Sequence, residues 1–416
     1  MTPAAPQRRR PRAAGAQETF VIIGAGQAGA QAAITMREHG FRGRVVVIGE
    51  ESQPPYQRPP LSKRFLENLV SVERLYLRPL AFYEAHGIEL KLHAVVEKID
   101  RGAARVHLQG GPRIAYDKLL IATGCRPRML DLPGGHASDI HYLRSLQDAL
   151  RIRSKLGRDR RLAVIGGGYI GLEVAATARS AGARVTVLES AECLLKRVTT
   201  QRVSDFFART HRAKGVEIRC NSRVAGFRGG ERLSGVICDD GLVEADVALI
   251  GVGAVPNAEL AEAAGLRCDD GIVVDAYCRT ADGAIFAAGD CTNHYNPLLG
   301  RRLRLESVQN AIGQARAAAL NMCGDEQPYA EVPWFWSQQY EFKLQSAGVR
   351  DGHDEIEERG SPEGGAFAVL YRKTGALVAI DAVNMPREYM LARKTMTEQG
   401  APASTTEAAA AGQRAA

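Results

Sequence analysis

The feature that most constrains the fold is a glycine pattern that occurs twice in the chain, each time between an apolar run and a helix-like segment. The first copy places Gly24, Gly26 and Gly29 after a β-branched run, and the next apolar run ends at Glu50. The first glycine of such a motif allows a tight turn, the second lets a pyrophosphate approach the backbone, and the third lets helix and strand pack closely. A terminal acid is placed to bind a ribose diol. The segment therefore predicts a dinucleotide site.

The second copy has the same parts in the same order. Gly166, Gly168 and Gly171 follow an apolar run, a helix-like segment comes next, and another apolar run ends at Glu189. A single glycine motif is weak support, but two copies with complete context predict two Rossmann-like α/β domains with parallel sheets. Each of the two domains would hold one dinucleotide.

Composition narrows the class of protein further. The 416 residues are 45% hydrophobic and 24% charged, which is ordinary for a globular chain of two or three domains. The net charge of +7 favours acidic partners without indicating nucleic acid, and no apolar run approaches the roughly 20 residues of a membrane span. The eight cysteines show neither a C-x-x-C pair nor zinc spacing, which predicts no metal site and a reducing, cytoplasmic location.

Glycine, proline and charged residues mark the expected boundaries between the tails and domains of the chain. Its ends are biased in composition, with arginines near the start and alanines at the end, and we expect both to be disordered. The last folded part mixes strand-like segments with a final helix. The predicted divisions are a disordered basic tail at 1–16, a first dinucleotide-binding domain at 17–132 and 257–330, a second dinucleotide-binding domain at 133–256, a small α+β C-terminal domain at 331–399, and a disordered tail at 400–416.

A proline-rich loop follows the first ribose acid. Four prolines between residues 54 and 60 predict a stiff extended segment, and a helix is expected at 61–68. The loop leaves the carboxyl end of the sheet, where ligands bind in open α/β folds. It contains Lys63, which by itself is better explained as a surface lysine. Asp290 ends a later apolar strand, where an ordinary loop-capping role is the alternative.

Four motifs together resemble a known family far more specifically than any glycine pattern does. The resemblance covers residues 19–394 and is to NADH-dependent, FAD-containing ferredoxin reductases of the putidaredoxin and rhodocoxin reductase type. These proteins serve bacterial haem monooxygenases and ring-hydroxylating dioxygenases. The motifs are R-P-P-L-S-K at 58–63, G-G-G-Y-I-G-L-E at 166–173, A-A-G-D at 287–290, and R-L-E-S-V-Q-N-A at 304–311 with P-W-F-W-S at 333–337.

The resemblance implies which residues bind each cofactor. The FAD residues would be Gly24, Gly26, Gly29, Glu50, Arg58, Lys63, Thr123, Gly124, Asp290, Glu306, Ser307, Val308 and Trp336. The NAD residues would be Gly166, Gly168, Tyr169, Ile170, Gly171, Glu173, Glu189 and Gly253.

Three of these residues are predicted to be catalytic. The resemblance implies that Lys63 approaches the flavin and pairs with Glu173, which is expected in the first turn of the second helix, where the macrodipole favours a carboxylate. Trp336 would lie against the flavin, although a domain-core aromatic is an equal alternative. At Gln338 the family commonly has an acid, so any flavin-tuning role of that side chain is in doubt.

The implied reaction passes electrons from NADH through FAD to an acidic 2Fe–2S ferredoxin, which feeds a terminal oxygenase. A flavin suits this task because it accepts a hydride and releases electrons singly. Glu189 predicts NADH rather than NADPH, since a carboxylate repels a 2′-phosphate. The candidate docking cations for the ferredoxin are Arg64, Arg301, Arg302, Arg304 and Lys343.

Three other functions share parts of this pattern. A disulfide reductase needs a cysteine beside the flavin, and the corresponding loop carries prolines and Lys63 instead, which argues firmly against it. An NADH-binding flavoprotein like apoptosis-inducing factor shares the proline-rich loop. A rubredoxin or monodehydroascorbate reductase differs only in its electron acceptor.

Overall fold

The computed structural model describes residues 17–400, so the tails predicted to be disordered lie outside the described residues except for Gly400. Across this described range no helix is long and apolar enough to cross a membrane. The chain forms two compact units. The first comprises residues 17–56, 76–125 and 256–331, and the second comprises residues 57–75, 126–255 and 332–400.

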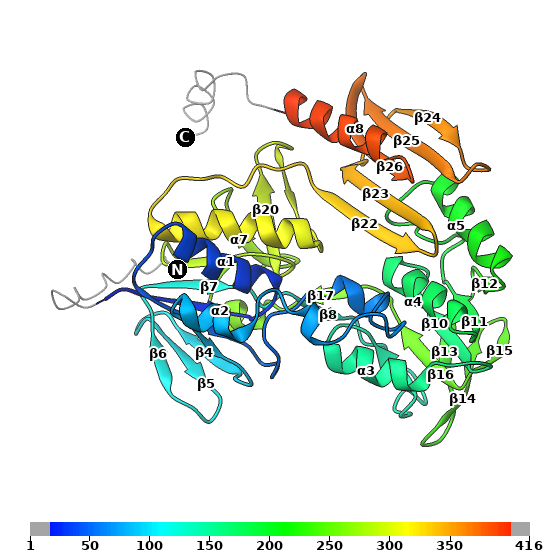
Figure 1. Cartoon of the computed structure of the whole chain (residues 1–416), viewed down its shortest axis with the longest axis horizontal. Coiled ribbons are helices and arrows are strands. Elements are labelled where there is room, and N and C mark those ends of the chain that lie inside the picture. Colours follow the sequence, from blue (N-terminus) through cyan, green and yellow to red (C-terminus); the bar gives the residue numbers. More distant parts are fainter. Residues whose placement is uncertain (1–16, 401–416) are drawn as a thin grey trace, which may run out of the picture. The chain divides into compact units, whose positions relative to one another are not determined.

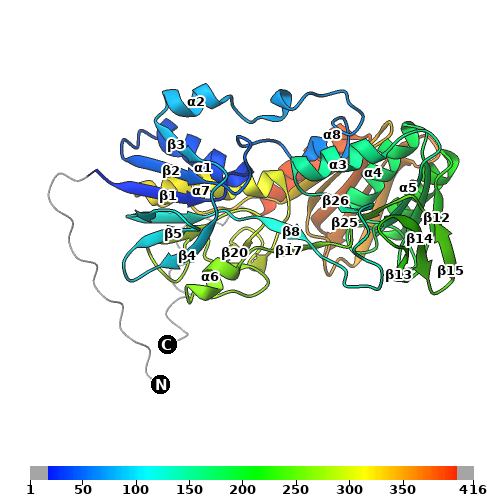
Figure 2. The same ribbon diagram turned by 90° about the horizontal axis from the view of Figure 1, so that it is seen from below.

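The first unit is organised by a five-stranded parallel sheet of order β19-β7-β1-β2-β3, of which Figure 1 labels β7 and Figure 2 labels β1, β2 and β3. Ile23 at the end of β1 is opposite Ile48 on one neighbour and Ile121 on the other. Because both faces of the sheet are covered, its strands are continuous apolar runs rather than alternating ones. The strands are β1 (Thr19–Ile23), β2 (Arg44–Ile48), β3 (Ile88–Lys91), β7 (Lys118–Ile121) and β19 (Ile285–Ala287).

Two alanine-rich helices cover one face of this sheet. The helices α1 (Gln27–Glu38) and α7 (Val308–Cys323) lie side by side, drawn in blue and yellow in Figure 2. Small side chains such as Ala32 and Ala315, both fully buried, let the two helices pack closely. The opposite face is covered by the antiparallel strands β4 (Val96–Asp100), β5 (Arg105–Leu108) and β6 (Arg113–Ala115) and by helix α6 (Glu259–Ala263).

Shorter elements complete the first unit. A three-stranded sheet of order β18-β20-β21 follows α6 in the chain. Two short strands, β8 (Cys125–Pro127) and β17 (Ala254–Pro256), lie where the chain passes between the units. The remaining elements are α2 (Leu80–Ala85), β18 (Ile272–Val274), β20 (Thr292–Asn296) and β21 (Arg301–Leu303).

The second unit repeats the first architecture with a parallel sheet of order β12-β11-β10-β16-β9. Its strands are β9 (Ile140–Tyr142), β10 (Arg161–Ile165), β11 (Arg184–Leu188), β12 (Glu217–Arg219) and β16 (Val247–Ile250). The other elements are α3 (Leu146–Lys155), α4 (Tyr169–Ser180), α5 (Gln201–Ala213), β13 (Val224–Gly229), β14 (Leu233–Cys238) and β15 (Gly241–Glu244).

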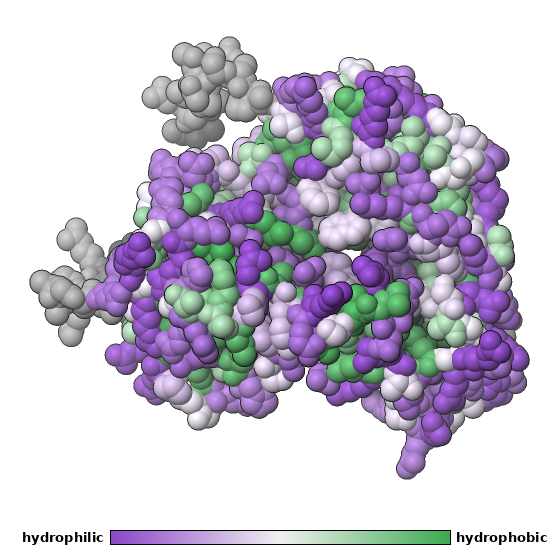
Figure 3. Space-filling view, in the orientation of Figure 1, coloured by the Kyte–Doolittle hydropathy of each residue, from purple (hydrophilic) through white to green (hydrophobic). Residues whose placement is uncertain are grey.

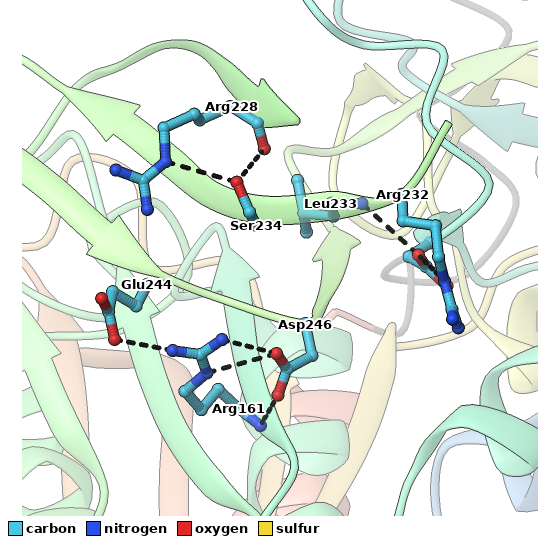
Figure 4. Close-up of polar contacts among 8 residues, drawn as sticks. Arg161, Arg228, Arg232, Leu233, Ser234, Glu244 and Asp246 are labelled. Atoms are coloured by element: carbon cyan, nitrogen blue, oxygen red, sulfur yellow. Dashed lines mark hydrogen bonds and ion pairs between the residues drawn. The ribbon is translucent and has the colours of Figure 1, made fainter. Parts of the chain in front are cut away.

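An ion-pair cluster fixes the amino ends of two central strands of this sheet. Arg161, the first residue of β10, donates to Asp246 at 2.6 Å and to Glu244 at 2.6 Å (Figure 4). The hydrogen bond from Arg161 holds the pKa of Asp246 below its ordinary value. The contact joins the start of β10 to the start of β16. It therefore stabilises the strand that leads into the second glycine turn.

The C-terminal segment of the second unit is an antiparallel sheet of order β22-β23-β26-β25-β24, with one helix packed on it. This agrees with the predicted α+β character, although the segment groups with residues 126–255 as one compact unit. The elements are β22 (Trp334–Gln339), β23 (Phe342–Gly348), β24 (Glu355–Ser361), β25 (Ala366–Lys373), β26 (Ala376–Val383) and α8 (Pro386–Gln399).

The helix predicted at 61–68 is wrong. The structure has a short 3₁₀ helix, η1 (Pro59–Ser62), followed by hydrogen-bonded turns, and a second one, η2 (Glu73–Leu75). The two prolines occupy the first helical positions, where a missing N–H is tolerated, and the helix ends because Lys63 leaves helical backbone angles with φ −129° and ψ −117°. Residues 57–75 also group with the second unit, although the loop was expected within the first domain.

Candidate active site

In the first glycine turn, the outer two glycines are required by packing. A Cβ on Gly24 would lie 2.1 Å from the Ala122 carbonyl oxygen, and one on Gly29 would lie 1.8 Å from the Gly24 carbonyl oxygen. A Cβ on Gly26 would meet nothing within 4 Å. Gly26 is the N-cap of α1, and no side chain there accepts from the first N–H groups of the helix. This geometry suits a phosphate at the helix amino terminus.

The second glycine turn has the same construction. A Cβ on Gly166 would lie 2.5 Å from the Gly251 carbonyl oxygen, and one on Gly171 would lie 2.3 Å from the Gly166 carbonyl oxygen. Gly168 caps α4 and has open space where a Cβ would be. Both units therefore carry a helix amino terminus with room for a pyrophosphate.

Further residues predicted for the flavin gather in the first unit. Thr123 donates to the carbonyl oxygen of Asn257 at 2.6 Å, and Gly124 adopts a φ of +68° that favours glycine. Asp290 follows β19 and accepts a hydrogen bond from the Cys125 thiol at 3.3 Å. The turns after β7 and β19 thus lie close together.

Helix α7 adds a second observation that fits a polar ligand here. Val308 begins the helix, and the Ser307 hydroxyl caps it by accepting from the Asn310 N–H at 3.1 Å. Gln314 accepts from the Gly289 N–H at 2.7 Å, beside the turn that carries Asp290. Within the described residues, Asn310 Oδ1 and Gln314 Nε2 are buried without a hydrogen-bond partner. A bound group that both donates and accepts, such as a sugar hydroxyl, would relieve this desolvation.

The two predicted ribose acids differ in their surroundings. Glu50 is exposed just after β2. Glu189 lies across the glycine turn, where its carboxylate accepts from the Gly167 N–H at 2.7 Å and from the Ala191 N–H at 2.8 Å. The backbone therefore fixes the Glu189 side chain beside the place where an adenosine ribose would bind.

Four other predicted residues lie in the second unit. Tyr169 is the first residue of α4 and packs on Phe335 with ring centroids 4.6 Å apart and the ring planes tilted by 30°, while Ile170 is 49% exposed at the same helix end. Gly253 follows β16 with a φ of +113°. Arg58 donates to the Arg144 carbonyl oxygen at 2.8 Å, which ties the proline-rich loop to this unit.

The centre of the candidate site is a buried ion pair between Lys63 and Glu173. The Lys63 ammonium lies 2.6 Å from Glu173 Oε2, and the Glu173 side chain is only 4% exposed. The same oxygen accepts from the Ser62 hydroxyl at 2.5 Å, and Oε1 accepts from the Ser337 hydroxyl at 2.7 Å. A buried carboxylate is tolerated only when it is paired and hydrogen-bonded, and Glu173 meets both conditions.

The predicted position of Glu173 in the first helical turn is wrong. Helix α4 begins at Tyr169, and no acidic residue lies in its first turn. The macrodipole acts mainly on the terminal turn, so it contributes less to Glu173 than we expected. Lys63 and the two serine hydroxyls stabilise the carboxylate instead.

Sequence analysis missed Ser62 and Ser337 as ligands of Glu173. Both lie inside motifs that were recognised, next to Lys63 and to Trp336. The alternation of β22 places Phe335 and Ser337 on the face that covers α4, where they contact Tyr169 and Glu173. Trp336 therefore points to the opposite face, where it is half-buried near Trp334, with ring centroids 5.7 Å apart.

The candidate docking cations are not equivalent. Arg304 pairs with Asp270 at 2.9 Å and also with Glu306, and Arg302 donates to the carbonyl oxygens of Val274 and Asn293. The exposed cations are Arg64, Arg301, Arg302 and Lys343. Figure 3 shows a largely polar face in which hydrophobic residues form scattered patches.

The cysteines do not provide disulfide chemistry. Within the described residues none of the eight forms a disulfide, and most are buried. Burial raises the pKa of the Cys268 thiol to about 11 and raises that of the Cys291 thiol above its ordinary value. The reactive form of cysteine is the thiolate. The Cys268 and Cys291 thiols therefore lack the activation that a redox disulfide requires.

Comparison with known proteins agrees with this geometry. The pyridine nucleotide-disulphide oxidoreductase family matches residues 18–315, and the reductase C-terminal family matches residues 334–414. Rhodocoxin reductase of Rhodococcus erythropolis is 43% identical over 383 residues, covering 92% of this chain and 90% of that protein. Putidaredoxin reductase of Pseudomonas putida is 41% identical over 391 residues, covering 92% and 93%.

Solved structures give the same result. The crystal structure of the covalent putidaredoxin reductase–putidaredoxin complex superposes with a TM-score of 0.90 at 41% identity, covering 92% of this chain and 94% of that one. The fold, the two glycine turns and the sequence identity thus agree over nearly the whole length. The chain belongs to the ferredoxin reductase family within the pyridine nucleotide-disulphide oxidoreductases, which use a flavin and a nicotinamide nucleotide.

Proposed function

We propose that this oxidoreductase passes electrons from NADH through FAD to an acidic 2Fe–2S ferredoxin that feeds a haem monooxygenase or a ring-hydroxylating dioxygenase. The observation that carries the proposal is the buried Lys63–Glu173 pair, in which Lys63 comes from the proline-rich loop and Glu173 from α4, the helix that follows the second glycine turn. When bound, the flavin supplies the conversion between hydride transfer and single-electron transfer. The protein residues bind and orient the two cofactors and exclude water from the site.

The proposed assignment of residues follows the two units. Gly26, Asp290 and the amino ends of α1 and α7 would hold the FAD, with the unpaired amide of Gln314 available to it. Gly168 and Glu189 would hold the nicotinamide dinucleotide. Lys63 and Trp336 would contact the flavin, and Glu173 would receive the nicotinamide carboxamide. We keep 17–132 with 257–330, 133–256 and 331–399 as the proposed functional domains.

We propose NADH rather than NADPH as the donor. Glu189 is held beside the second glycine turn by two backbone N–H groups, so its charge cannot easily leave the site. A carboxylate there accepts a hydrogen bond from a 2′-hydroxyl and repels a 2′-phosphate. A cytoplasmic location suits the eight free cysteines, because reducing conditions keep thiols free.

The test is reconstitution with defined acceptors. Purified protein should carry FAD, identified by chromatography of the cofactor that heat releases. NADH should reduce its flavin band, and cytochrome c reduction should depend on an added acidic 2Fe–2S ferredoxin. Rubredoxin and a ferredoxin-free mixture are the controls. A long-lived reduced complex with NAD and negligible turnover would instead support the signalling flavoprotein.

A further inference from the structure

A continuous hydrogen-bond chain leads from Glu173 through the interior of the second unit to its surface. Ser337 Oγ is 2.7 Å from Glu173 Oε1 and 3.3 Å from Gln339 Nε2. Gln339 Oε1 is 2.8 Å from His211 Nε2, and His211 Nδ1 is 3.3 Å from the Tyr340 hydroxyl. Glu173, Ser337, Gln339 and His211 are all buried, with His211 and Ser337 at 0% exposure.

The ionised Glu173 carboxylate fixes the direction of every link. A carboxylate only accepts hydrogen bonds, so the single hydroxyl proton of Ser337 must point to Glu173. Ser337 can then only accept from Gln339, which must present its N–H₂ group to the serine. That orientation turns the Gln339 carbonyl oxygen toward His211, so the histidine must carry its proton on Nε2.

The far end of the chain is consistent with this direction. His211 Nδ1 is then without a proton and accepts from the Tyr340 hydroxyl. Burial lowers the pKa of His211 and raises the pKa of Tyr340 to about 12, so the neutral forms needed here are the favoured ones. Tyr340 itself lines a surface hollow with Arg179, Lys214 and Glu341. Every donor in the chain therefore points toward Glu173.

We propose that His211 and Gln339 are positioning residues for hydride transfer, because they hold the Ser337 proton on the Glu173 carboxylate. This inference rests on the proposed role of Glu173 toward the nicotinamide. The chain does not conduct protons, since an amide donates through nitrogen and accepts through oxygen and cannot pass a proton along without changing tautomer. Its effect is to fix geometry and charge, as outer hydrogen bonds commonly do for ligating groups.

The sharpest test reverses one link without changing its shape. Gln339→Glu replaces the donating amide with a second carboxylate, which would compete with Glu173 for the single Ser337 proton. Ser337→Ala removes the last link directly and takes only one oxygen atom from the site. Gln399→Glu makes the same chemical change on the exposed end of α8, outside the hydrogen-bond chain, and serves as the control.

The first measurement is the limiting rate of flavin reduction by NADH in stopped-flow mixing of the holoenzyme. We expect a fall of about tenfold for Gln339→Glu and for Ser337→Ala, in line with lost outer hydrogen bonds, and no fall for Gln399→Glu. The double variant should be no slower than Ser337→Ala, because both changes break one chain. Wild-type rates in Gln339→Glu, or additive losses in the double variant, would overturn the proposal.

The second measurement needs no turnover. Ring ¹⁵N NMR, with the signal assigned by a His211→Asn variant, should show neutral His211 protonated on Nε2 in the wild type. In Gln339→Glu the new carboxylate should draw a second proton onto the ring. If the wild-type His211 ring carried its proton on Nδ1, the hydrogen bonds would run in the opposite direction and the proposal would be rejected. If NADH failed to reduce the wild-type flavin, the proposed function would fail, while the tautomer would still decide the hydrogen-bond direction.

Discussion

At the scale of single residues, the Lys63–Glu173 pair sets the stability of the site. Replacing Lys63 by Met would leave a carboxylate that is 4% exposed without its cation. We expect a loss of about 3 kcal/mol in the free energy of unfolding, because removing one partner of a buried pair leaves an uncompensated charge. Denaturant unfolding of the apoprotein would measure it.

A double variant provides the matched control for this pair. Lys63→Met combined with Glu173→Gln carries no unpaired charge, so it should recover part of the loss seen in Lys63→Met alone. If the double variant were less stable than the sum of the two single changes, the pair would not be the source of the effect.

Glu189 controls the choice of nicotinamide cofactor at the same scale. Glu189→Ala should narrow the preference for NADH over NADPH by about tenfold or more, because the negative charge facing the 2′-position is lost. The measurement is kcat/KM for each cofactor. Glu189→Gln separates charge from shape, since its side-chain oxygen can still accept from the Gly167 N–H. Equal kcat/KM values for the two cofactors in the wild type would contradict the assignment.

Among the elements, the two glycine turns offer a matched pair of substitutions. Gly29→Ala should lower the free energy of unfolding by about 2 kcal/mol or more, since its Cβ would lie 1.8 Å from a carbonyl oxygen. Gly26→Ala meets nothing within 4 Å and should leave the apoprotein as stable as the wild type. Its methyl group would occupy the space of a pyrophosphate, so the flavin content should fall. Thermal unfolding measures the stability of both variants, and flavin absorbance measures their flavin content. Normal flavin content in Gly26→Ala would mean that the phosphates bind elsewhere.

The same elements show how far the sequence could predict the structure. The two parallel sheets and both glycine turns could be predicted because their signals are local and fixed in spacing. The short helix at Pro59 and the position of Glu173 within its helix could not be predicted. Both depend on the exact first residue of a helix, which a sequence pattern gives only to within one or two residues. Ser337 meets Glu173 across 164 residues, and no local pattern encodes such a contact.

At the scale of the whole molecule, charge should govern the encounter with the ferredoxin. The chain carries a net charge of +7, and an acidic partner would be steered toward it at low ionic strength. Ferredoxin-dependent cytochrome c reduction should therefore fall as salt rises, while reduction of the small acceptor ferricyanide should change less. Lys343→Ala should weaken the salt dependence, because Lys343 is exposed. Arg304→Ala should not, because Asp270 and Glu306 already neutralise that guanidinium. A flat salt profile in the wild type would mean that shape and apolar contact, rather than charge, bring the two proteins together.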